Sequence, residues 1–182
     1  MKRVLLIIGI IGIVLIALVL IGAIVLSLFF LPMTPKPSEK RVAGIFKNER
    51  QEFELIADAF IGIDADVLYI NNTRNDYNQI EVLDKVPVET YEYNDEELHN
   101  AITFLFDNRY CDSIDKERNY VSFSMWGTLD ASSGIAYSID GELPDICGQM
   151  PDNRKILELV PLENDGWYYY YLKIVKATSS VP

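Results

Sequence analysis

Apolar residues recur at helical spacing in two segments of the chain. The first segment, residues 47–61, carries one apolar stripe at positions i, i+3, i+4 and i+7, formed by Phe53, Ile56, Ala57 and Phe60. The second begins at Asn94, which we expect to cap a helix together with Glu97 three residues later. Its stripe consists of Leu98, Ala101, Ile102, Leu105 and Phe106. The pattern therefore predicts two amphipathic helices, the second ending near residues 109–111.

Alternation of apolar and polar residues predicts strands elsewhere. A short strand is expected at 67–70, followed by extended segments at 80–82 and 86–93, the latter at a sheet edge because it contains Pro87. After residue 120 the period of two continues through 120–129, 135–139, 156–162 and 167–175, with turns at 130–134 and 163–166. The order of elements predicts an α+β domain in which both helices pack on one face of an antiparallel β-meander.

Residues 4–31 form an apolar run without a single charge. As a helix this run would extend about 42 Å, which exceeds the hydrocarbon core of a bilayer at about 30 Å. It is about twice as long as the apolar region of a secretory signal and lacks a small-residue cleavage site. We therefore predict an uncleaved, single-pass transmembrane helix.

The chain divides around this predicted anchor. Residues 1–3 form a short tail, 32–40 a Pro-rich linker, 41–178 the α+β domain, and 179–182 a C-terminal tail. Lys2 and Arg3 directly before the apolar run favour a cytoplasmic N-terminus, which places the domain outside the cytoplasm. Basic residues also follow the run, so the positive-inside rule gives only a preference.

The domain after the anchor is strongly acidic. The chain has 16 Lys and Arg, of which two precede the anchor, so 14 oppose 27 Asp and Glu and leave a net charge of −13. Nucleic acid is an unfavourable partner for such a surface, because phosphate binding requires a basic footprint. A cationic protein or a component of the cell envelope is compatible with the charge, as is an acidic surface that only keeps the domain soluble.

The two cysteines, Cys111 and Cys147, allow two interpretations. In an oxidising compartment they can form a disulfide, which closes a loop of about 36 residues and contributes about 3–4 kcal/mol. They are equally compatible with two unrelated buried thiols. Their spacing matches no zinc site.

The aromatic run at residues 167–171 is the first candidate binding site. On a strand, Trp167, Tyr169 and Tyr171 share one face, where they could stack on a sugar or a peptide. The alternative is a central strand with one aromatic face in the core and the other beneath a helix or loop.

Other candidate groups have ordinary explanations. His99, the only histidine, lies on the polar side of the second helix and is expected to be a solvated surface residue rather than a general base. The acids Asp64 and Asp66, and the group Asp140, Glu142 and Asp145, lie in loops and do not match a calcium-binding loop. The sequence predicts no catalytic, cofactor or metal-binding residues.

The segments 134–144, 159–162 and 166–170 read GIAYSIDGELP, LVPL and GWYYY. Together they resemble the C-terminal part of small uncharacterised bacterial proteins, many of which have an N-terminal membrane anchor. This resemblance covers about a quarter of the chain and implies no activity. It indicates a bacterial host.

These observations predict a non-enzymatic, membrane-anchored extracytoplasmic binding or accessory module. One variant is an immunity or inhibitor protein, whose acidity would suit a cationic toxin. The alternative is a small hydrolase of cell-envelope glycan that uses two of the many carboxylates. A deep pocket with two facing carboxylates would favour the hydrolase, and a flat acidic face would favour binding.

Overall fold

The computed structural model describes residues 35–73, 77–128, 130–144, 146, 154–163 and 165–174. The tail 1–3, the predicted membrane-spanning segment 4–31, most of the linker and the C-terminal residues 179–182 lie outside these ranges. No helix within them is long and apolar enough to span a membrane, and the anchor stays a prediction. From Lys36 onwards the chain forms one compact unit.

Two helices replace the first predicted one. Helix α2 spans Glu39–Asn48, and helix α3 spans Arg50–Gly62, with a break at Glu49 where φ is −114° and ψ is 26°. The boundary predicted at residue 47 was wrong because residues 39–46 also carry a buried apolar pair, Val42 and Phe46, at helical spacing. Ser38 caps α2, so residues 39 and 40, assigned to the linker, belong to a helix.

Helix α4, Glu96–Asp107, confirms the second predicted helix and shifts its cap by one residue. The Oδ1 atom of Asp95, rather than the side chain of Asn94, accepts hydrogen bonds from the amides of Glu97 at 2.9 Å and Leu98 at 3.1 Å. The five apolar residues of the predicted stripe are all buried. Asp95 takes the cap because its carboxylate reaches two of the free amides of the first turn.

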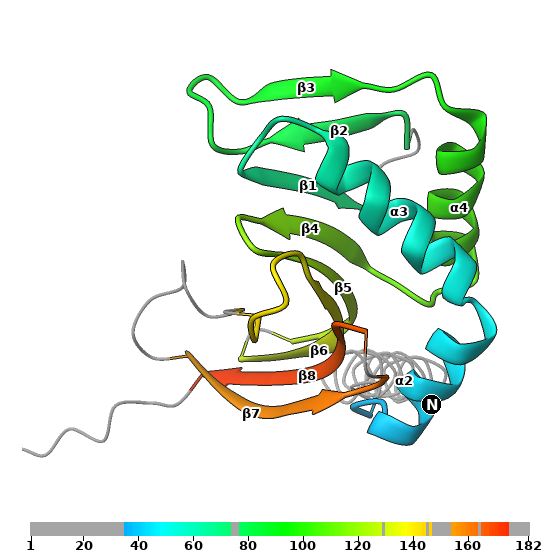
Figure 1. Cartoon of the computed structure of the whole chain (residues 1–182), viewed down its shortest axis with the longest axis vertical. Helices are drawn as coiled ribbons and strands as arrows, with labels where there is room; N and C mark the ends of the chain where they lie inside the picture. The colour runs from blue at the N-terminus through cyan, green and yellow to red at the C-terminus, as the bar shows by residue number, and fades with distance from the viewer. Residues whose placement is uncertain are drawn as a thin grey trace, which may run out of the picture. The chain divides into compact units, whose positions relative to one another are not determined.

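The sheet has eight antiparallel strands in the spatial order β3-β2-β1-β4-β5-β6-β8-β7 (Figure 1). Their bounds are β1 Val67–Asn71, β2 Gln79–Val82, β3 Glu89–Glu92, β4 Ser113–Glu117, β5 Tyr120–Gly127, β6 Ala131–Ser138, β7 Arg154–Pro161 and β8 Trp167–Ile174. The structure confirms the α+β class. The order departs from a simple meander at β1, which pairs with β4 across the inserted helix α4, and at β8, which lies between β6 and β7.

Two strands differ from the sequence-based expectation. The sequence of β4, SIDKE, was not recognised as a strand because Lys116 takes an inward position. That side chain is only 6% exposed, and its Nζ atom donates to the carbonyl oxygen of Ile63 at 2.7 Å. Strand β6 begins at Ala131, four residues earlier than predicted. Ser132 and Ser133 resemble a turn in composition, yet both pair with strands on either side.

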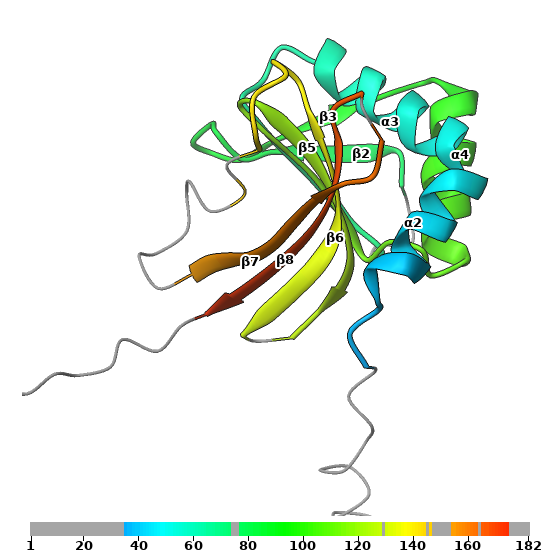
Figure 2. The same cartoon turned by 60° about the horizontal axis from the view of Figure 1, so that its bottom comes forward.

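One face of the sheet holds the main core. The three helices lie on this face (Figure 2), and their apolar stripes meet inward residues of the strands, including Leu68, Ile80, Phe123 and Trp167. A smaller apolar cluster forms on the opposite face around Tyr170 and Leu172, where Ile146 of the loop between β6 and β7 also packs. The inner surfaces of all three helices are therefore committed to the fold, and only their outer surfaces face solvent.

Gly134 should be essential for the close pairing of β5 and β6. A Cβ atom added there would overlap the carbonyl oxygen of Phe123 and lie 3.0 Å from the Tyr170 hydroxyl. We expect Gly134→Ala to lower the free energy of unfolding by about 2–4 kcal/mol, because the backbone of a central strand has to shift. Chemical denaturation measures this loss.

Gly127→Ala is the matched control on β5, since its added Cβ would approach no atom closer than 4.0 Å. We expect this variant to stay within about 1 kcal/mol of the wild type. Equal stabilities for the two variants would contradict the close approach at Gly134.

Candidate functional site

The aromatic side chains of β8 divide between the two faces of the sheet as predicted. Trp167 and Tyr169 enter the main core, whereas Tyr170 belongs to the small cluster on the opposite face. Trp167 is 2% exposed, and its ring centroid lies 4.9 Å from that of Phe46 and 4.8 Å from that of Tyr137. Two of the three rings considered as a binding surface are thus core residues.

The third ring, Tyr171, is covered by the beginning of the described chain. The Nζ atom of Lys36 lies 3.6 Å from the centroid of the Tyr171 ring and 3.0 Å from the Glu158 carboxylate. A cation over an aromatic face contributes about 0.5–1 kcal/mol at a partly exposed site. This contact, which we call the Lys36 clamp, attaches the end of the linker to β7 and β8 and leaves little of the aromatic face for a ligand.

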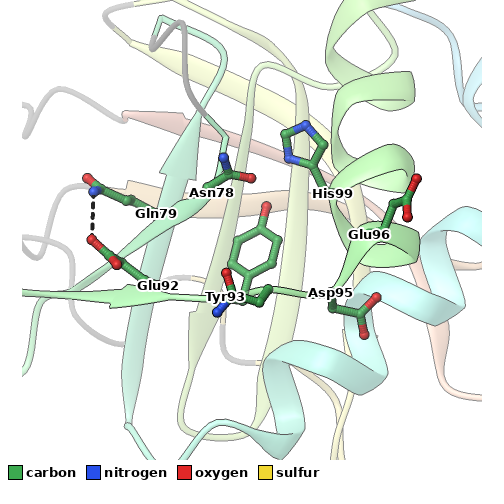
Figure 3. A pocket seen from close by; sticks show the side chains of 8 residues that line it. Asn78, Gln79, Glu92, Tyr93, Asp95, Glu96 and His99 are labelled. Atoms are coloured by element: carbon green, nitrogen blue, oxygen red, sulfur yellow. Dashed lines mark hydrogen bonds between the residues drawn. The ribbon is translucent and has the colours of Figure 1, made fainter.

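A cavity of about 480 Å³ lies at the N-terminal end of α4, beside the ends of β2 and β3 (Figure 3). Its lining is polar and includes His99, and it contains no Lys or Arg. The residues are Asn78, Gln79, Glu92, Tyr93, Asn94, Asp95, Glu96 and His99. This cavity tests the hydrolase alternative, because it brings three carboxylates to one place.

The three carboxylates do not form a facing pair. Glu92 accepts a hydrogen bond from the Nε2 atom of Gln79 at 3.1 Å, and Asp95 caps α4. Figure 3 shows Glu92 and Glu96 on opposite sides of the cavity, both directed away from the space between Tyr93 and His99. The Tyr93 hydroxyl donates to the carbonyl oxygen of Tyr77. The arrangement offers neither the opposed acid and base of an inverting glycosidase nor the close pair of a retaining one.

His99 is half-buried at the edge of this cavity rather than fully solvated. Its Nδ1 atom is buried and has no hydrogen-bond partner within the described part of the chain. No carboxylate is seen to orient the ring, as the base of a catalytic triad would require.

The loop acid Asp140 serves as a turn former. Asp140 accepts hydrogen bonds from the Glu142 amide at 2.9 Å and the Ser138 hydroxyl at 3.2 Å, and these bonds hold the pKa of Asp140 below its usual value. The amide of Asp66 donates to the Asp84 carboxylate. Asp145 lies outside the described residues. Within the described ranges, no three His, Cys, Asp or Glu side chains are grouped so that they could hold a metal ion.

Cys111 is a free, fully buried thiol. Its Sγ atom donates to the carbonyl oxygen of Ser113 at 2.8 Å, and burial raises the pKa of this thiol well above its usual value. A thiol in this environment is unreactive. Cys147 lies outside the described residues, so the pairing of Cys111 with Cys147 stays a prediction.

The outer surface of the helix layer contains a groove that the sequence analysis did not predict. It lies between α3 and α4, measures about 300 Å³, and is lined by Gln51, Glu52, Leu55, Glu97, Asn100, Ala101 and Phe104. The available signal was the position of two residues: Leu55 and Phe104 are large apolar side chains that lie off the inward stripes of their helices. Each is ordinary alone, because single exposed apolar residues are common on protein surfaces.

A second feature that the sequence did not reveal is the carboxyl group of Asp115, on the face of β4 away from the helices. Its Oδ2 atom accepts a hydrogen bond from the Ser113 hydroxyl at 3.2 Å, and Ser122 lies opposite it on β5. Burial raises the pKa of Asp115 to about 7, and the negative charge of Glu117 adds to this effect. Carboxyl groups with a shifted pKa are frequent at functional sites. The neighbouring Tyr120, Ser122 and Tyr170 are buried, however, which favours a structural origin for the shift.

The raised pKa of Asp115 predicts a specific pH dependence of stability. Between about pH 4 and pH 7 the native state retains a proton that the unfolded chain has lost, so this group's contribution to stability falls as the pH rises through that window. We expect Asp115→Asn to be more stable than the wild type at pH 8, by up to about 4 kcal/mol. At pH 4 the two proteins should differ much less.

Urea unfolding at both pH values measures this difference. Asp107→Asn, on the exposed last position of α4, removes the same formal charge and serves as the control. A stability difference between wild type and Asp115→Asn that does not change with pH would contradict the assignment.

Comparison of the chain with protein-family models, with curated proteins and with solved structures finds no match to any of them. The resemblance of the C-terminal segments to small bacterial proteins therefore stays a prediction.

Proposed function

We propose that this chain is a single-pass, membrane-anchored protein whose acidic domain lies outside the cytoplasm and binds a cationic partner protein without catalysing a reaction. The observation that carries this proposal is the charge on helices α3 and α4. Helices α3 and α4 together contain six acidic residues, Glu52, Glu54, Asp58, Glu96, Glu97 and Asp107, against a single basic residue, Arg50.

Arg50 does not balance this charge on the outer surface. Its guanidinium group forms ion pairs with Glu54, Glu163 and Asp165, which connect the start of α3 to the turn between β7 and β8. Its positive charge is thus matched by acids on both sides. The remaining carboxylates of α3 and α4 produce a negative surface potential, which accelerates association with a positively charged protein.

The aromatic residues of β8 and the cavity beside α4 support a binding role over catalysis. Two of the three aromatic residues that could have formed a ligand platform are core residues, and Glu92 and Glu96 of the cavity beside α4 point apart. A glycan hydrolase therefore has less support than a binding module. An immunity or inhibitor protein is one member of the proposed class, because such proteins neutralise a cationic enzyme by covering it.

The proposal predicts salt-dependent capture of a basic protein by the full-length chain. When the detergent-solubilised protein is immobilised and exposed to envelope extract, we expect a basic protein to bind at low salt and to be released at high salt. The triple variant Glu96→Gln/Glu97→Gln/Asp107→Asn should capture about tenfold less, since each exposed ion pair contributes about 0.5 kcal/mol.

A second triple variant, Glu89→Gln/Glu92→Gln/Glu142→Gln, provides the matched control. It removes three exposed acids outside the helix layer, and the captured amount should change little. The proposal fails if no basic protein is retained at low salt, or if both triple variants reduce capture equally.

The orientation in the membrane predicts a labelling result. Asp107→Cys places a thiol at an exposed position of α4, and a membrane-impermeant maleimide should label it in intact bacterial cells. The wild type, which has the buried Cys111 and also Cys147, gives the background. Labelling of Asp107→Cys above this background only after permeabilisation would place the domain in the cytoplasm.

A further inference from the structure

We infer that the groove between α3 and α4 is a docking site for an amphipathic helix of a partner protein, with apolar residues on one face of that helix and Lys or Arg beside them. This inference rests on the proposed function and specifies where and in what form the cationic partner binds. The two helices lie side by side with their outer surfaces exposed (Figures 1 and 2).

The floor of the groove is apolar and shaped by residues of very different size. Ala101 lies between Leu55 of the facing helix and Phe104 one turn further along α4. Its small side chain leaves the space that the larger two enclose. Phe104 remains 36% exposed, and its ring lies 6.0 Å from that of Tyr110 in an edge-to-face arrangement, which holds it in place. An apolar side chain that enters here covers surface that water now contacts.

The rim of the groove is acidic on both sides. Glu52 stands on the α3 wall and Glu97 on the α4 wall, and the other polar lining residues, Gln51 and Asn100, are neutral. None of the lining residues is Lys or Arg, so the groove offers no counter-charge to an acidic segment. A partner with Lys or Arg next to its apolar residues would satisfy both the floor and the rim, whereas an anionic or purely apolar segment would satisfy at most one.

The walls of the groove favour a helix over an extended segment. Helix walls have already paired their own backbone amides and carbonyls, so they cannot form a ladder with an added strand. A helix pairs its own backbone and presents apolar residues at i, i+3 or i+4, and i+7. The α4 wall has the same period, with Glu97, Asn100, Ala101 and Phe104, and spans about 10 Å.

The test uses the full-length protein in detergent and a synthetic helical peptide that has leucine at i, i+3, i+4 and i+7 and lysine at the outer positions. A scrambled peptide of the same composition keeps the charge but lacks the apolar stripe. Fluorescence anisotropy of labelled peptides at low salt measures both affinities. We expect the amphipathic peptide to bind at least about tenfold more tightly than the scrambled one.

Variants of the groove distinguish the contribution of its floor to peptide affinity from that of its rim. We expect Phe104→Ala to weaken binding of the amphipathic peptide about tenfold and Glu52→Gln/Glu97→Gln to weaken it about five- to tenfold. Two matched controls should leave it nearly unchanged: Leu157→Ala, which truncates an apolar residue that is 50% exposed on β7, and Glu89→Gln/Glu142→Gln, which removes two exposed acids outside the helices.

Hydrogen exchange of the wild type with the bound peptide gives an independent readout that needs no variant. Protection concentrated in residues 51–55 and 97–104 supports docking in the groove. Two results overturn docking in the groove but not the proposed cationic partner. One is equal affinity for both peptides, and the other is an equal loss of affinity in the groove variants and the control variants. If neither peptide binds at low salt, the groove is overturned, whereas the proposed function is overturned only if the full-length chain also retains no basic protein.

Discussion

The packing of Trp167 joins the first two helices of this domain to its central strands. Its indole ring contacts rings from α2, α3, β5 and β6, namely Phe46, Phe53, Phe123 and Tyr137, at centroid distances between 4.8 and 6.4 Å. Aromatic pairs of this kind contribute about 0.5–1.5 kcal/mol beyond the area that they bury. Because β8 carries Trp167, its place between β6 and β7 and the position of the first two helices depend on the same contacts.

The packing of these aromatic residues leaves little of them exposed to a ligand. The helix-facing rings of β8 pack in the core or lie beneath Lys36, so they stabilise the fold rather than bind a ligand. The outer surfaces of α3 and α4 stay exposed, with six acids against Arg50 and with Leu55 and Phe104 as added apolar area. The exposed ion pairs of Arg50 connect the start of α3 to the β7–β8 turn.

Local signals account for the elements that were predicted correctly. Helix α4 combines an N-cap, acids in the first turn and an unbroken apolar stripe, all within twelve residues, and β8 begins with a continuous run of strand-favouring aromatic residues. Elements without such signals were missed. Helix α2 follows a Pro-rich segment and has only two buried residues. Strand β4 places Lys116 at an inward position, where the carbonyl oxygens of Ile61 and Ile63 at the end of α3 accept hydrogen bonds from its ammonium group.

The sequence by itself determined the period of most helices and strands, the division of the β8 aromatics between two faces, the negative charge of the domain and the apolar run at residues 4–31. These properties depend on residues close together in the chain. Only the tertiary structure decided the strand order, the burial of Trp167, the raised pKa of Asp115 and the groove between α3 and α4. Each of these arises from contacts between segments that are distant in sequence, such as Leu55 and Phe104, and no local pattern records which distant segments will meet.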